Sequence, residues 1–447
     1  MLAACTQADG GTSASSSAVS SPVVLTPFPD TVTTTPIKHV VFLMQENRSF
    51  DHMFGTFPGA DGVTLGWDHG VRRPLTRASD QKIPDLPHCW QCATISYDGG
   101  RLDGFNQSDN ADAYAYTQLR KQDEPNYWHW ASHYVLGDRY FSSERGPSYA
   151  NHFYMIAGQS AGAHDNPERP PGAGSLTWGC DSPEEENVRV VDAQGNASWV
   201  DPCFDVPTVA DRLNQKKVPW AHYAATSRQR GYIWSAYSSI RHVFYGEQWQ
   251  DHVLPVQNVA RDIKTRGLPA VTWITPRFEF SNHPSASFCY GENWATKVID
   301  TIMRSPQWKS TAIFLTWDEW GGFYDHVVPP TAAGMNANIS YGFRVPLLVI
   351  SPWTKVGTLA NGGYVSSRFA SHASLLRFVE SAFGLPSLGA MDDLANYTAA
   401  EPKPGDLMDF FDFSGVTPPK GKLVLATRTC PTLSVAQKAY IASWNPD

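Results

Sequence analysis

The segment HVVFLM, residues 39–44, is a short apolar run with polar residues at both ends, and it decides the fold class. An unbroken apolar run of this length predicts a β-strand that is buried on both faces. Similar runs recur at residues 218–225, 270–275, 312–317 and 345–351. Segments with helical spacing occupy residues 207–215, 292–303 and 368–383. Strands that alternate with helices predict an α/β fold, with a mostly parallel central sheet and helices on both faces.

The composition along the chain divides it into three parts. Residues 1–35 include a stretch rich in Ser, Ala and Gly at 10–21, which is typical of a flexible tether. Residues 36–401 carry the expected strands and helices, and we expect them to form one α/β domain. Within it, residues 55–127 have little periodicity and predict a long functional insertion over one end of the sheet. Residues 402–447 predict an irregular segment that wraps the same domain and ends in a short helix.

The overall charge argues against a nucleic-acid partner. The net charge is −8, and the adjacent basic pairs are scattered rather than gathered into a stripe. A protein that binds the phosphate backbone usually carries such a stripe. No apolar run is long enough to span a bilayer.

The cysteines indicate an exported protein. The sequence LAAC at residues 2–5 resembles the lipobox of a bacterial prolipoprotein, so Cys5 is a candidate lipid anchor in the cell envelope, either periplasmic or in the outer membrane, with secretion as an alternative. The alternative interpretation of Cys5 is a chance cysteine in a disordered tail. Six further cysteines remain, an even number that predicts up to three disulfides in an oxidising compartment. Cys180 and Cys203 bracket an acidic excursion and are the first expected pair, while Cys89 and Cys92 form a disulfide or free thiols rather than half of a zinc site.

Two of the expected strands end in groups that suit a hard cation. Glu46 and Asn47 come shortly after the first strand, and Asp318 and Glu319 directly follow the run at 312–317. Ligands bind outside the carboxyl ends of the strands in an open α/β sheet, and carboxylate and amide oxygens suit a divalent metal ion. The spacing alone fits helix caps or turn residues equally well.

Four motifs in order along the chain resolve that choice. They are ENRSFDH at 46–52, GPSYANH at 146–152, NHP at 282–284 with GENW at 291–294, and DEWGGFYDH at 318–326. Together they resemble the bacterial phosphoesterase family, which holds the non-specific phospholipases C and related acid phosphatases. The likeness runs from about residue 37 to about residue 385. That family resembles the alkaline-phosphatase superfamily in fold and mechanism.

The resemblance implies a role for each matched residue. Glu46, Asn47, Asp318 and Glu319 are expected to hold one divalent metal ion, and Ser148 to be both the nucleophile and a further ligand. A serine hydroxyl becomes a good nucleophile only when a base or a metal favours its alkoxide. Attack on phosphorus would then give a phosphoserine that water hydrolyses.

Histidines complete the expected site. The resemblance places His283, His326 and His88 at or near active-site positions, where a protonated ring can donate to phosphate or to the leaving group. An acidic pH optimum follows from that role. Three other histidines are expected to have supporting or packing roles, and they are His52, His152 and His372.

The substrate is expected to be a phosphorylated small molecule or a phospholipid. Ser148 stands where phospholipase C members typically have threonine, and its following residues are closer to the acid-phosphatase branch. A phosphomonoesterase is therefore the first hypothesis, and a phospholipase C is the second. Tyr127, Trp128 and Trp130 would line a lipid entrance in the second case, although such a cluster is more often core. A tethered phosphate-binding lipoprotein without catalysis is the alternative of another class.

Overall fold

The computed structural model describes residues 26–29, 31–78, 80, 85–107, 114–168, 177–331, 339–399 and 401–432. The expected tether with Cys5, apart from its last residues, and the expected final helix lie outside these ranges. None of the helices in the described ranges combines the length and the apolar character that crossing a bilayer requires.

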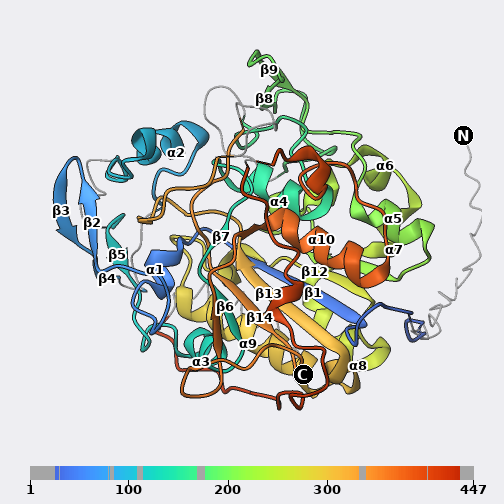
Figure 1. Ribbon diagram of the computed structural model, residues 1–447. Coiled ribbons are helices and arrows are strands. Elements are labelled where there is room, and N and C mark those ends of the chain that lie inside the picture. Colours follow the sequence, from blue (N-terminus) through green and yellow to red (C-terminus); the bar gives the residue numbers. More distant parts are fainter. Residues whose placement is uncertain are drawn as a thin grey trace, which may run out of the picture.

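An eight-stranded sheet forms the centre of the protein (Figure 1). Its strand order is β11-β10-β12-β1-β13-β14-β6-β15. Neighbouring strands are parallel except where β14 meets β13 and β6. The prediction of a mostly parallel sheet is therefore confirmed. The strand bounds are β1 His39–Gln45, β6 Val135–Gly137, β10 Trp220–Ala224, β11 Val253–Pro255, β12 Val271–Ile274, β13 Thr311–Trp317, β14 Leu347–Ile350 and β15 Tyr364–Ser366.

Helices cover both faces of this sheet, as predicted (Figure 1). On one face α4 packs against α5 and α10, and on the other α9 packs against α3 and α8. Their bounds are α3 Pro125–His133, α4 Ser148–Ala157, α5 Val209–Gln215, α8 Val259–Arg266, α9 Phe288–Arg304 and α10 His372–Phe383. Each covering helix buries its apolar side against the sheet, which is why the apolar strands read as continuous runs.

Two of the predicted helix starts were wrong, and side-chain caps explain both. The helix expected from residue 292 begins at Phe288, because the Ser287 hydroxyl accepts from the N–H of Tyr290. The helix expected from residue 368 begins at His372, because Ser371 and Ser374 form a capping box.

The insertion at residues 55–127 contains little regular structure. It holds a small hairpin of β2 and β3, which lies at its outer end, a short parallel pair, and the helix α2 (Figure 1). The remaining short elements are α1 Phe50–Phe54, β2 Leu65–Asp68, β3 Val71–Pro74, β4 Thr76–Arg77, α2 Trp90–Tyr97, β5 Thr117–Gln118, β7 Tyr140–Phe141, β8 Val188–Val191, β9 Ala197–Val200, α6 Arg241–Phe244, α7 Glu247–His252 and β16 Ala370–Ser371.

Three disulfides join the cysteines beyond Cys5. The pairs are Cys89–Cys92, Cys180–Cys203 and Cys289–Cys430. The predicted pairing of Cys180 with Cys203 is confirmed. The last disulfide holds residues 412–432, a segment without helix or strand that we call the C-terminal strap. The strap runs past α3 and α9, where the Tyr134 hydroxyl donates to the carbonyl of Gly421 at 2.9 Å and Arg428 pairs with Glu292 at 2.6 Å.

Candidate active site

Glu46 and Asn47 follow β1, and Asp318 and Glu319 follow β13, at the carboxyl ends of two adjacent parallel strands. The last residues of these strands pair in register, so both turns leave the sheet side by side. The backbone N–H of Asn47 donates to Asp318 Oδ1 at 2.8 Å and joins the two turns. All four side chains are fully buried. The structure thus brings the expected oxygen ligands together.

Ser148 reaches this group from another part of the chain, as the first residue of α4. It is 2% exposed, and its hydroxyl lies 3.4 Å from Glu46 Oε2. The side-chain amide of Asn151 donates to the carbonyls of Gly146 and Pro147 at 3.1 and 3.2 Å, which holds the turn ahead of the serine. A helix N-terminus favours negative charge, so this position suits both an alkoxide and a phosphate.

The side chains at the two strand ends fit a divalent cation. Among the described residues, Asn47 Oδ1, Asp318 Oδ2 and Glu319 Oε1 are buried and have no hydrogen-bond partner. Burial, and next the negative charge of Asp318, raise the pKa of Glu46 and of Glu319 well above the usual range. Clustered carboxylates without a counter-charge are costly to bury, and a hard cation would compensate them.

His152 extends the same cluster. Its Nε2 lies 2.9 Å from Glu46 Oε1 and 4.0 Å from Asp318 Oδ2, and the three residues offer ligand atoms within 4.8 Å of one another. Burial lowers the pKa of His152 to about 4, so the ring is neutral near pH 7. A neutral imidazole either ligates a metal ion or orients the carboxylate that does.

A second group lies nearby and contains Asp85, His88 and His283, whose ligand atoms are also within 4.8 Å of one another. Each histidine Nδ1 lies 2.6 Å from a backbone carbonyl, so that nitrogen carries the proton and Nε2 holds the lone pair in the neutral ring. Burial lowers the pKa of His283 to about 4, against the opposing charges of Asp85 and Asp318. His283 can therefore donate from Nε2 to a phosphate only after it takes up a proton.

His326 belongs to a different set of charged residues. Its Nδ1 lies 2.6 Å from Asp51 Oδ2, and its Nε2 lies 3.2 Å from Asp61 Oδ1. The fully buried Arg344 ion-pairs with Asp51 at 3.3 Å and donates to the carbonyl of Asp61 at 2.7 Å. Although burial opposes protonation, the hydrogen bond to Asp51 raises the pKa of His326. Within the described ranges, the hydrogen bonds of His326 stay in this set, so its catalytic role remains a prediction.

Arg48 connects the first motif to the loop that carries His283. Its Nε and Nη2 donate to the carbonyl of Asn282 at 2.9 and 2.6 Å. The side chain of Asn282 accepts from the Tyr127 hydroxyl at 2.8 Å and donates to the carbonyl of Phe288 at 2.9 Å. Asn282 therefore shapes the loop, which explains why an amide serves at this position.

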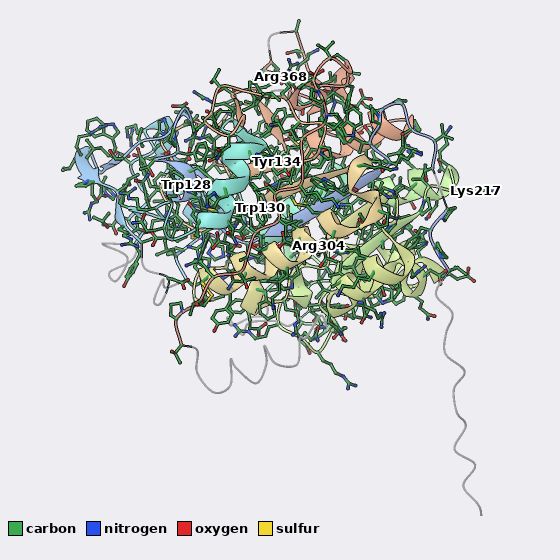
Figure 2. All side chains as sticks on the ribbon, turned by 90° about the horizontal axis from the view of Figure 1, so that it is seen from below. Trp128, Trp130, Tyr134, Lys217, Arg304 and Arg368 are labelled. Carbon is green, nitrogen blue, oxygen red and sulfur yellow. A yellow bond between two sulfur atoms is a disulfide. The ribbon has the colours of Figure 1, made fainter. Side chains whose placement is uncertain are left out.

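The other aromatic and histidine candidates lie in packed positions. Tyr127, Trp128 and Trp130 are buried, and the two tryptophans lie on α3 (Figure 2). The interpretation of this cluster as core fits these positions better than a lipid entrance does. The rings of His52 and His372 are also buried and contact backbone carbonyls.

Two residues of the site escaped the sequence analysis. Asp85 lies in the irregular insertion, where no periodic pattern marks it, although its position three residues before His88 is a usable signal. Asn151 lies within the motif at 146–152, and its role depends on a local turn that residue spacing does not reveal.

The fold and the site together define an α/β protein in which buried oxygen ligands at two strand ends face a serine at a helix start. The chain belongs to the Phosphoesterase family, whose model matches residues 37–386. The family expected from the four motifs is confirmed.

Relatives of the chain include several phospholipases C. The hemolytic phospholipase C of Pseudomonas aeruginosa is 26% identical over 85% of this chain and 56% of that protein. Phospholipase C A of Mycobacterium tuberculosis is 24% identical over 86% of this chain and 78% of that protein. The non-specific phospholipase C6 of Arabidopsis thaliana is 25% identical over 79% and 69%, respectively. This chain thus spans little more than half of the Pseudomonas protein.

A solved structure of similar arrangement is a protein in the alkaline phosphatase superfamily from Vibrio parahaemolyticus. It is 12% identical, and the superposition has a TM-score of 0.37 and covers 86% of this chain and 76% of that one.

Proposed function

We propose that the protein hydrolyses phosphoric esters through a phosphoserine formed on Ser148. One observation carries the proposal: the Ser148 hydroxyl lies 3.4 Å from a carboxylate of a buried oxygen-ligand cluster, at the start of a helix. Neither a turn residue nor a structural serine requires such surroundings. Membership of the Phosphoesterase family supports the same reaction class.

The chemistry assigns a task to each residue. The Ser148 hydroxyl donates toward Glu46, so its proton has an acceptor as Oγ attacks phosphorus. The Oγ–P bond forms while the ester P–O bond breaks, and a protonated His283 or His88 gives the departing oxygen its proton. Water then attacks phosphorus and gives a proton to the now neutral histidine, while Oγ leaves and takes back the proton that Glu46 accepted. A bound divalent ion would neutralise the phosphoryl oxygens, held by Glu46, Asn47, Asp318 and Glu319.

The substitution Ser148→Ala tests the proposal. Hydrolysis of a chromogenic phosphoester should fall about a thousandfold or more, because the nucleophile is lost. Binding of inorganic phosphate, measured by calorimetry, should survive because the other expected metal ligands, Glu46, Asn47, Asp318 and Glu319, are intact. Acid quenching of the wild type with a ³²P-labelled ester should trap label on the peptide that contains Ser148. Unchanged turnover in the variant would refute the mechanism, and a wild type that binds phosphate without turnover would identify a phosphate-binding protein instead.

Phosphomonoesters are the first proposed substrate class, because the residues after Ser148 resemble the acid-phosphatase branch. Phospholipid diesters are the second, and the printed names of the relatives favour them. A direct comparison of kcat/KM for p-nitrophenyl phosphate and p-nitrophenylphosphorylcholine separates the two. Faster turnover of the diester would reverse this order.

We also propose that the protein works outside the cytoplasm, because its three disulfides fit an oxidising compartment. Cell fractionation followed by thiol labelling tests this proposal. Labelling of these six cysteines in protein taken from cells would contradict it.

A further inference from the structure

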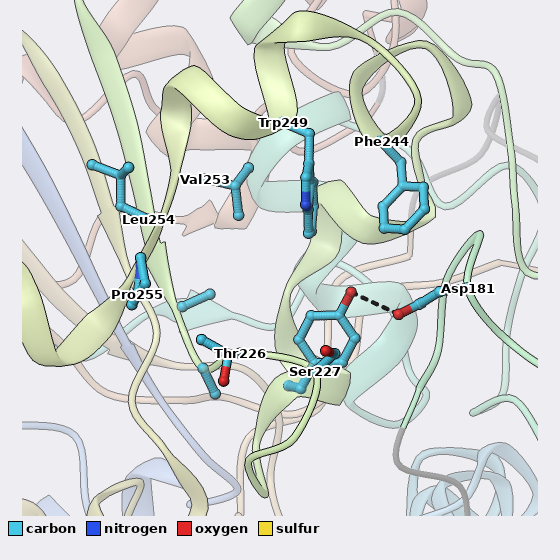
Figure 3. A pocket seen from close by; sticks show the side chains of 11 residues that line it. Asp181, Thr226, Ser227, Phe244, Trp249, Val253, Leu254 and Pro255 are labelled. Atoms are coloured by element: carbon cyan, nitrogen blue, oxygen red, sulfur yellow. Dashed lines mark hydrogen bonds between the residues drawn. The ribbon is translucent and has the colours of Figure 1, made fainter. Parts of the chain in front are cut away.

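A pocket of about 250 Å³ opens where β10 and β11 end, at the carboxyl ends of the parallel strands, as the candidate active site also does (Figure 3). Its walls include Ala224 at the end of β10 and Pro255 at the end of β11. These strands lie on the far side of β12 from β1, so the pocket is distinct from the cluster around Glu46. The residues of the proposed hydrolysis are not among the lining residues of this pocket.

Three aromatic side chains and one carboxylate give the pocket its character. Tyr232, Phe244 and Trp249 line it, and the rings of the last two lie 4.8 Å apart. Asp181 accepts a hydrogen bond from the Tyr232 hydroxyl at 2.9 Å (Figure 3). The lining residues that the structure describes include no lysine, arginine or histidine. The pocket is therefore aromatic with a single negative charge.

The carboxylate of Asp181 accepts from the Tyr232 hydroxyl but has no basic partner among the described lining residues. Its Oδ1 is enclosed and has no hydrogen-bond partner in the described ranges. Burial raises the pKa of this carboxyl above its usual value, which means that the charged form is poorly solvated there. The disulfide between Cys180 and Cys203 and the hydrogen bond to Tyr232 hold the residue in place.

We propose that this pocket binds a small organic ammonium cation, of the tertiary or quaternary kind. Aromatic faces attract a diffuse cation, and a nearby carboxylate adds charge complementarity. A phosphate would meet a negative charge without a basic partner, and an uncharged apolar ligand would leave Asp181 further desolvated. A hard metal ion would find too few oxygen ligands.

The pocket also shares an element with the candidate active site. Tyr232 begins the short 3-10 helix Tyr232–Trp234, and the Trp234 ring stacks on His283 with centroids 5.8 Å apart. The cation is either a free amine or, resting on the proposed function, the head group of an ester held at Ser148. The ammonium chemistry is common to both sources.

Titration of the full-length protein with choline, followed by calorimetry, tests the site without reference to catalysis. The neutral isostere 3,3-dimethylbutan-1-ol serves as the ligand control. The substitution Asp181→Asn keeps the shape and should weaken choline binding about tenfold or more, whereas Asp251→Asn removes an exposed charge from the neighbouring helix α7 and should not. Trp249→Leu keeps Asp181 and should also weaken binding, so it decides the matter if Asp181→Asn is unstable.

Equal binding of choline and its neutral isostere would overturn the proposal, as would an unchanged affinity in Asp181→Asn or no binding of choline. Kinetics then distinguish the two sources of the cation. A head group in the pocket predicts that Asp181→Asn raises KM for p-nitrophenylphosphorylcholine but not for p-nitrophenyl phosphate. A free amine predicts that both KM values stay unchanged while choline binding is still lost, and either result supports the site.

Discussion

The three disulfides should stabilise the protein in the order of the chain lengths that they close. A cross-link acts mainly by restricting the unfolded chain, and its effect grows with the logarithm of the loop length. The loops span 3, 23 and 141 residues for Cys89–Cys92, Cys180–Cys203 and Cys289–Cys430. The chain-entropy relation then gives about 1.5, 3.5 and 5 kcal/mol at 25 °C.

The native state offers a reason to expect the full effect from the longest loop. When Cys289 and Cys430 are both replaced by alanine, the C-terminal strap keeps other anchors. Arg428 still pairs with Glu292, and Asn126 Nδ2 still donates to the carbonyl of Ala426 at 3.0 Å. The folded form therefore changes little, and the loss falls on the unfolded state.

The assay compares the three Cys→Ala double variants with the wild type in urea. Unfolding is followed by tryptophan fluorescence and far-ultraviolet circular dichroism at pH 7 and 25 °C, and the free energies of unfolding are extrapolated to water. Cys289→Ala with Cys430→Ala should lose about 1.5 kcal/mol more than Cys180→Ala with Cys203→Ala. A reversed order, or three losses equal within about 0.5 kcal/mol, would refute the entropic reasoning.

Three further outcomes are expected. Glu46→Gln should lower the metal content of the purified protein about tenfold or more, measured by mass spectrometry of the metal, because it removes a charged oxygen ligand; full metal occupancy would argue against the ligand role. Because the pKa of His283 is lowered to about 4, kcat/KM for a phosphoester should fall as the pH rises above that value, and His283→Gln should flatten the profile; a wild-type rate that climbs steadily to pH 9 would contradict this. The raised pKa of His326 means that its pairing with Asp51 stabilises the fold fully below pH 6.5 and less as the pH rises through the raised value. His326→Gln should therefore cost about 1–3 kcal/mol at pH 5.5 and less at pH 9 in urea titrations, and an equal cost at both pH values would exclude the ion pair.

The central part of the fold and the cluster of buried oxygen side chains were predictable because both depend on local patterns. Continuous apolar runs marked β1 and β13, and polar residues directly beyond them marked Glu46 and Asp318. The three-residue strands β6, β11 and β15 were missed, since so short a segment carries no periodicity.

Ser148 could be assigned only through its motif, because a serine in a Gly-Pro-Ser turn has no distinctive pattern. Asp85 and His88 meet His283 through tertiary contacts of an irregular insertion, which residue spacing does not encode. The contacts of His326 are likewise set by tertiary packing, because Asp51 and Asp61 come from distant parts of the chain.

Because β1 pairs with β13, the expected metal ligands can come together only late in the synthesis of the chain. Asn47 and Asp318 are 271 residues apart, so the ribosome releases the first long before the second is made. Until β13 pairs with β1, Glu46 lacks the other expected ligands and has little affinity for a metal ion. A divalent ion held by this cluster would therefore stabilise only the completed sheet, by mass action, and would not start its folding.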